Sequence, residues 1–147
     1  MARIYIDMDG VLCNFAKAFN ERREADPSQP FPQSQFGFWI NLEPIEGAIE
    51  SVKVLEEVFD VWFLSKPSFD NLNSFSEKAY WINKYFGPYM LRRLILCGDK
   101  SLLIGDYLID DTTTANQKEF NGKFIHFGTE EFPDWTKVLQ YFATHAI

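Results

Sequence analysis

Cysteine, basic residues and long apolar runs are scarce in this sequence, and each scarcity excludes a class of protein. Cys13 and Cys97 stand far apart and have no cysteine or histidine partner at ligand spacing, so neither a disulfide scaffold nor a zinc site is expected. No stretch approaches the roughly 18 apolar residues of a membrane helix. Asp7 and Asp9 interrupt the apolar N-terminus where a signal peptide would be continuous. We therefore expect a cytoplasmic protein with no membrane partner.

The charge balance is acidic, with 14 Lys and Arg against 21 Asp and Glu and a formal net charge of −7. Such a surface repels a nucleic acid polymer, whereas a small phosphate ester beside a metal ion remains compatible with it. The 147 residues suffice for one domain with a sizeable core. Aromatic residues make up 17% of the chain, which supplies large apolar groups for that core and for contact with a flat ligand. The oligomeric state is left open, a homodimer included.

Apolar periodicity predicts strands that alternate with helices. This order is typical of a single Rossmann-like α/β domain, with a mostly parallel sheet and helices on both faces. Prolines and Gly37 break the periodicity after the first helix, which predicts a small cap or lid insertion at about 24–43 within a domain that spans 1–147. The expected strands are 3–7, 60–65, 94–97, 107–111 and 124–127, and the expected helices are 11–23, 47–59, 73–86 (stopped by Gly87-Pro88) and 134–144.

Two carboxylates stand two residues apart where the first strand ends, in Asp7-Met8-Asp9-Gly10. Asp7 could attack phosphorus to form an acyl phosphate, and Asp9 could protonate the leaving oxygen and later activate water. Carboxylates this close repel each other unless a cation or a proton is present. The alternative is an exposed turn with two solvated acids.

Further polar groups follow other strands of the predicted sheet, and parallel strands bring such groups to one edge. Asp110 and Asp111, together with Asp7 and the backbone carbonyl of Asp9, would give an all-oxygen environment suited to Mg²⁺. Lys100 and Ser65 would complete a phosphate clamp, a role that Lys66 or Lys84 could also take on charge alone. The alternative for the acidic pair is an exposed acidic turn.

Together these segments resemble the haloacid-dehalogenase-like phosphohydrolases, and most closely their 5′(3′)-deoxyribonucleotidase family. The resemblance extends from Ile4 to Trp135. Two departures stand out: the insertion before Leu42 is shorter than the small helical cap of the family, and Ser65 replaces a common threonine. The segments that carry the likeness are Asp7–Val11, Leu42-Glu43-Pro44, Gly47-Ala48, Glu77-Lys78, Trp81, Lys84–Pro88, Gly98-Asp99-Lys100 and Asp106–Asp111.

The resemblance implies a Mg²⁺-dependent phosphatase with an aspartyl-phosphate intermediate, acting on 5′- or 3′-(deoxy)nucleoside monophosphates. A phosphatase of another small metabolite and a non-catalytic nucleotide-binding domain of the same fold are the alternatives. By likeness, Asp7 is the nucleophile, Asp9 the acid/base and a metal ligand, Ser65 and Lys100 the phosphate binders, and Asp110 or Asp111 a metal ligand, with Asp111 favoured. Phe15, Trp39 and Lys66 are the remaining candidates for substrate binding, the two aromatics being equally compatible with core packing.

Overall fold

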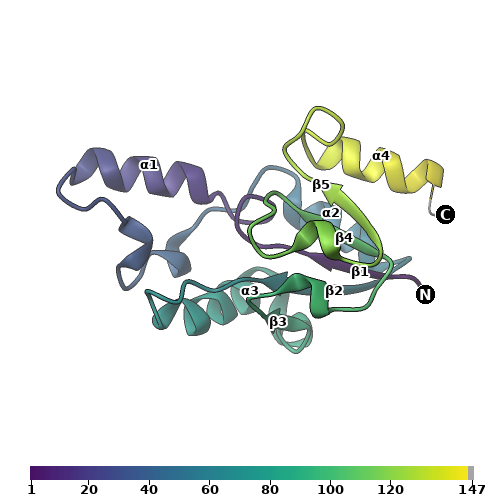
Figure 1. Cartoon of the computed structure of the whole chain (residues 1–147), viewed down its shortest axis with the longest axis horizontal. Coiled ribbons are helices and arrows are strands. Elements are labelled where there is room, and N and C mark those ends of the chain that lie inside the picture. Colours follow the sequence, from purple (N-terminus) through teal and green to yellow (C-terminus); the bar gives the residue numbers. More distant parts are fainter. Residues whose placement is uncertain (146–147) are drawn as a thin grey trace.

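A five-stranded parallel sheet, in the order β3-β2-β1-β4-β5, organises the molecule (Figure 1). The computed structural model describes residues 1–145. All four strand pairs are parallel, with β1 between β2 and β4. The predicted α/β class and parallel sheet are therefore confirmed. The strands are β1 (Arg3–Ile6), β2 (Asp60–Ser65), β3 (Leu94–Leu96), β4 (Tyr107–Asp110) and β5 (Lys123–His126).

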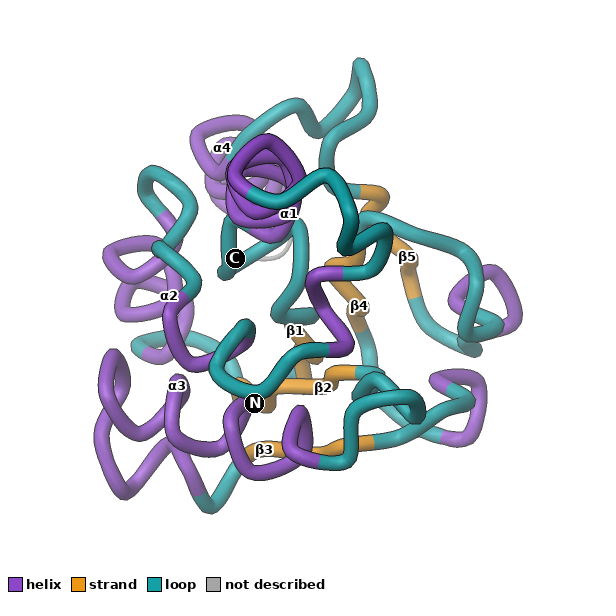
Figure 2. Tube along the Cα trace, turned by 90° about the vertical axis from the view of Figure 1, so that its left-hand side faces the viewer, coloured by secondary structure: helices purple, strands orange, loops and turns teal. Residues whose placement is uncertain are grey.

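Three α-helices pack on one face of this sheet: α2 (Ala48–Glu56), α3 (Asn73–Leu91) and α4 (Trp135–His145). Ile4 and Ile6 of β1 belong to the same apolar cluster as Val52 of α2, Trp81 of α3 and Val138 of α4. In the turned view of Figure 2, α2, α3 and α4 lie to one side of the strands. This face holds most of the buried hydrophobic residues.

Short 3-10 helices and loops cover the other face. Tyr5, Leu64 and Leu108 point there and pack with Phe120 and Leu103 in a smaller cluster. The chain reverses its direction across the sheet after β3, so right-handed crossovers place the β3–β4 and β4–β5 connections opposite α2 and α3. These connections carry only the 3-10 helices η3 (Lys100–Leu102) and η4 (Gln117–Glu119). The helices predicted for this second face are therefore single 3-10 turns, because each connection is too short for a longer helix.

Helix boundaries differ from the predicted ones where the loop after β1 turns tightly. Helix α1 (Phe15–Ala25) begins four residues later than expected, because the amides of Val11, Leu12 and Cys13 all bond to the carbonyl of Met8. The stop predicted at Gly87-Pro88 is confirmed as a break within α3, since Gly87 has φ 86° and only a short turn follows to Leu91.

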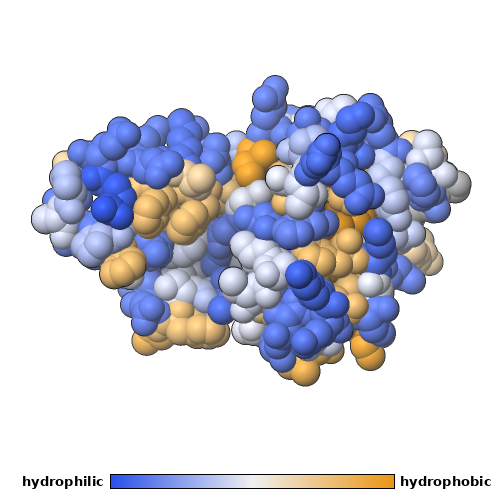
Figure 3. All heavy atoms as spheres, turned by 45° about the horizontal axis from the view of Figure 1, so that its top comes forward, coloured by the Kyte–Doolittle hydropathy of each residue, from blue (hydrophilic) through white to orange (hydrophobic). Residues whose placement is uncertain are grey.

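Segment 26–43 lies with α1 beyond the carboxyl ends of the strands (Figure 1). It contains the 3-10 helices η1 (Pro32–Ser34) and η2 (Trp39–Asn41) and is joined to α3 by side-chain hydrogen bonds. The face in Figure 3 is mostly hydrophilic, with apolar side chains gathered beneath α1. No helix in the described part of the chain has the length and apolar character to cross a membrane.

Candidate active site

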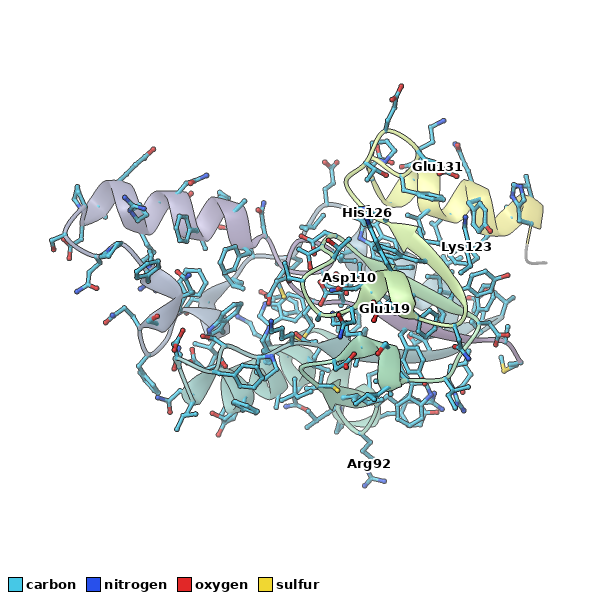
Figure 4. The ribbon with its side chains drawn as sticks, viewed as in Figure 1. Arg92, Asp110, Glu119, Lys123, His126 and Glu131 are labelled. Carbon is cyan, nitrogen blue, oxygen red and sulfur yellow. The ribbon has the colours of Figure 1, made fainter. Side chains whose placement is uncertain are left out.

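The carboxyl ends of β1, β2 and β4 bring the predicted polar residues to one edge of the sheet. Asp7 follows β1, Ser65 ends β2 and Asp110 ends β4. Figure 4 shows Asp110 at this edge, with His126 at the end of neighbouring β5. A cavity of about 300 Å³ opens here; it is lined by Asp7, Asp9, Gly10, Phe15, Ala16, Lys66, Lys100, Asp111, Thr112, Thr114, Ala115 and Gln117.

Lys100 forms the floor of this cavity and is only 1% exposed. Its ammonium donates to Asp7 Oδ1 at 2.8 Å and to Asp110 Oδ2 at 2.5 Å. Burial by itself lowers the pKa of Lys100, but the charges of Asp7 and Asp110 outweigh it and raise that pKa above its usual value. Gln117 also donates to Asp110, at 3.2 Å. Lys100 is thus held as a cation beside Asp7. Of the two other lysines that charge alone would allow in this role, Lys84 lies exposed with its ammonium over Tyr85.

Asp7, Asp110 and Asp111 offer carboxylate oxygens that all lie within 4.8 Å of one another. Burial and then the charge of Asp7 raise the pKa of Asp111 to about 8 and that of Asp110 to about 6. Gly10 allows this proximity, because a Cβ there would lie 1.9 Å from Asp111 Oδ2. Three carboxylates lie close together here, and the one ammonium group of Lys100 does not balance their charge. A hard divalent cation that prefers oxygen ligands would do so, and these residues therefore fit Mg²⁺.

Lys78 does not line the cavity but bonds to two residues of the site, a role that no motif of the sequence predicts. It is 1% exposed and reaches from α3 to donate to Asp9 Oδ2 at 2.6 Å and to Ser65 Oγ at 2.8 Å. Its ammonium also lies 4.2 Å from the centre of the Trp39 ring. The available signal was helical spacing, since Lys78 falls four residues after Ser74 and three before Trp81, on the buried face of the helix.

Comparison with known proteins identifies the family. The model of the family described as "5' nucleotidase, deoxy (Pyrimidine), cytosolic type C protein" matches residues 26–138. A protein of Vibrio phage KVP40, provisionally named a 5′(3′)-deoxyribonucleotidase, is 39% identical over 140 residues, or 94% of this chain and 82% of that protein. The chain belongs to the 5′(3′)-deoxyribonucleotidase family. It is a phosphoric monoester hydrolase of that family.

Other similar proteins carry related names. The human cytosolic-type 5′(3′)-deoxyribonucleotidase is 29% identical over 168 residues, which cover 93% of this chain and 78% of the human protein. Among solved structures, a provisionally described haloacid dehalogenase-like hydrolase of Burkholderia xenovorans LB400 matches with a TM-score of 0.47 and 12% identity, covering 84% of this chain and 80% of that one.

The remaining predicted site residues of this family member lie at different depths. Lys66 is exposed and lines the cavity, and Phe15 is half-buried and forms part of its wall. Ser65 is fully buried and reaches the site through Lys78. Trp39 is 5% exposed, packs on Phe15 with ring centres 5.5 Å apart, and does not line the cavity. Contact between Trp39 and a substrate therefore stays a prediction.

In the metal-free protein, stability is expected to fall as the pH rises. Both Asp110 and Asp111 have raised pKa values when folded, so their contribution to stability is complete below about pH 4, the pKa of a free aspartate. It is lost as the pH rises through the folded values of about 6 and about 8. The thermal unfolding midpoint in EDTA should therefore fall from about pH 5 to about pH 9.

Two controls assign this pH effect to the carboxyl cluster. Mg²⁺ should restore the midpoint at the alkaline end, because it stabilises the ionised carboxylates. The variant Asp111→Asn should flatten the profile, since its amide does not titrate. A midpoint that rises with pH in EDTA would contradict the prediction.

Proposed function

We propose that this chain is a Mg²⁺-dependent phosphomonoesterase that removes phosphate from 5′- or 3′-(deoxy)nucleoside monophosphates through an aspartyl-phosphate on Asp7. The observation that carries the proposal is the convergence of Asp7, Lys100 and Asp111 on the floor of one cavity. Each comes from a different segment of the chain, and together they supply a nucleophile, a fixed cation and a metal ligand.

Asp7 and Asp9 perform the two chemical steps in this proposal. In the first, a carboxylate oxygen of Asp7 forms a bond to phosphorus while the ester P–O bond breaks, and Asp9 gives its proton to the leaving alkoxide. In the second, water attacks phosphorus, Asp9 takes a proton from it, and the bond to Asp7 breaks to release phosphate. Asp9 lines the cavity, and its Oδ1 is buried with no hydrogen-bond partner among the described residues, which leaves that oxygen available for proton transfer.

Two buried lysines are suited to binding the phosphate oxygens. Lys100 lies beside Asp7, and Lys78 lies beside Asp9 and Ser65. Fixed cations in a site shielded from water stabilise negative charge that develops on the transferring group. Asp7, Asp111 and the Asp9 carbonyl would hold Mg²⁺, with Asp110 either as a further ligand or as a hydrogen-bond partner of one, and the bound ion would neutralise further phosphate charge.

The substrate assignment rests on the family and on the cavity wall. The named relatives are deoxyribonucleotidases, and Phe15 presents an aromatic ring beside the phosphate site, where it can stack on a base or pack on a sugar. Segment 24–43 would act as the small cap above it. A cytoplasmic location belongs to the same proposal, on the cytosolic type of the human relative.

A panel of phosphate esters, assayed with and without Mg²⁺, tests the proposed function. Deoxynucleoside monophosphates should be hydrolysed with higher kcat/KM than sugar phosphates or p-nitrophenyl phosphate, and EDTA should abolish all turnover. Preference for a sugar phosphate would replace the substrate class and keep the chemistry. Absence of turnover on every ester with Mg²⁺ would point to a binding domain and overturn the proposal.

Replacing Phe15 by alanine is expected to raise KM for nucleoside monophosphates, by as much as the roughly 1–3 kcal/mol that a base–aromatic stack contributes. Hydrolysis of a sugar phosphate should change much less, because its leaving group has no flat aromatic ring to stack. The matched control is Phe19→Ala, since Phe19 stacks on Phe15 from the next turn of α1 and does not line the cavity. Equal losses for both substrates would make Phe15 a packing residue.

A further inference from the structure

Four buried side-chain atoms lack a hydrogen-bond partner in the described part of the chain: Asp9 Oδ1, Gln33 Oε1, Trp39 Nε1 and Glu77 Oε2. Asp9 has a role in the proposed chemistry, but the buried carboxyl group of Glu77 has none. A polar group this deeply buried costs stability unless it is bonded, so its retention calls for a reason. Glu77 is only 3% exposed and directly precedes Lys78 on α3.

Glu77 joins α3 to the segment that carries Trp39. Its Oε1 accepts from the backbone amide of Ile40 at 3.2 Å. One helical turn further along, the Trp81 indole donates to the carbonyl of Leu42 at 2.9 Å. Residues 40–42 are thus held by two hydrogen bonds, one accepted by Glu77 and one donated by Trp81. Of these two residues, Glu77 is the one adjacent to Lys78.

Trp39 links this contact to the phosphate site. It precedes Ile40, and its ring lies 4.2 Å from the Lys78 ammonium. A ring face attracts a cation and leaves it few directions to move, which favours the bonds from Lys78 to Asp9 and Ser65. We propose that Glu77 is a positioning residue, which holds Trp39 against Lys78 and thereby fixes the ammonium for binding the substrate phosphate.

This inference rests on the proposed phosphatase function and deepens it at Lys78. Lys78 bonds to Asp9 and Ser65, whereas Lys100 bonds to Asp7 and Asp110 of the carboxylate cluster. Loss of its positioning should therefore weaken phosphate binding more than it slows the reaction of bound ester. An error of about 1 Å in a binding group is enough to be measured in this way.

The test measures the inhibition constant of inorganic phosphate in p-nitrophenyl phosphate hydrolysis, and phosphate binding by calorimetry, for the full chain with Mg²⁺. Glu77→Leu keeps the volume and removes the acceptor, and it should raise the inhibition constant roughly tenfold with a smaller change in kcat. Glu77→Gln keeps an acceptor for Ile40 and should remain close to wild type. Trp81→Phe is the matched control, because it removes the neighbouring bond to the same segment.

A double-mutant cycle separates positioning from general damage. If Glu77 acts through Lys78, then Glu77→Leu should have little effect on phosphate binding in a Lys78→Met background. Trp39→Leu removes the ring and leaves Glu77 in place, and it should raise the inhibition constant of phosphate as Glu77→Leu does. If Glu77→Leu does not fold, Trp39→Leu provides the test in its place. Additive losses in the cycle, or an equal loss in Trp81→Phe, would overturn the inference. A wild-type chain that neither binds phosphate nor hydrolyses the ester would instead overturn the proposed function.

Discussion

Replacing Asp7 by asparagine is expected to reduce kcat at least about 10³-fold, for deoxynucleotides and p-nitrophenyl phosphate alike. The amide has the shape of the carboxylate but is a poor nucleophile, so the covalent step cannot proceed. Steady-state hydrolysis of both esters at saturating Mg²⁺ provides the measurement. Activity within a few-fold of wild type would remove Asp7 from the nucleophile role.

The fold of Asp7→Asn should persist, which makes the comparison interpretable. Lys100 keeps its bond to Asp110, and the amide oxygen of the new residue can still accept from the ammonium. Beryllofluoride, a mimic of the phosphoryl group, supplies a second readout. With Mg²⁺ it should inhibit and stabilise the wild-type chain by binding at Asp7, and it should lose both effects in the variant.

Replacing Lys100 by methionine is expected to impair both stability and catalysis. Methionine fills much of the volume, but Asp7 and Asp110 are left buried at 5% and 0% exposure without their cation. Removing one partner of a buried ion pair costs about 3–5 kcal/mol. Denaturant unfolding without Mg²⁺ should show a loss of this size, and kcat/KM should fall by roughly 10² or more because a fixed cation is lost.

Lys66→Met is the matched control for the stability measurement. Lys66 lines the same cavity but is exposed and has no ion pair among the described residues, so its removal should change the free energy of unfolding by less than about 1 kcal/mol. Mg²⁺ should recover part of the stability lost in Lys100→Met, since it supplies positive charge to the same carboxylates. A Lys100→Met protein as stable as Lys66→Met would show that the buried pairs contribute little.

The sequence by itself predicts the order of the strands and the positions of the acidic residues that follow them. Short apolar runs and the carboxylates that follow them predict β1, β4 and the positions of Asp7 and Asp110, because a parallel sheet leaves only one edge for such groups. Gly87-Pro88 predicts the break in α3 through its local backbone chemistry. These features depend on residues that are close together along the chain, so they can be predicted from the sequence alone.

Contacts between distant segments were decided only by the tertiary structure. Lys78 resembles any other helical lysine in the sequence, and only the packing of α3 in the folded protein brings it to Asp9 and Ser65. In the sequence, Trp39 and Phe15 are equally good candidates for binding a nucleoside. In the structure, Trp39 is buried and Phe15 lies on the cavity wall. The face that receives 3-10 helices follows from the reversal of the chain after β3. The spacing of residues specifies which side chains share one face of a helix. Which element packs against that face depends on the tertiary structure, and local periodicity carries no information about it.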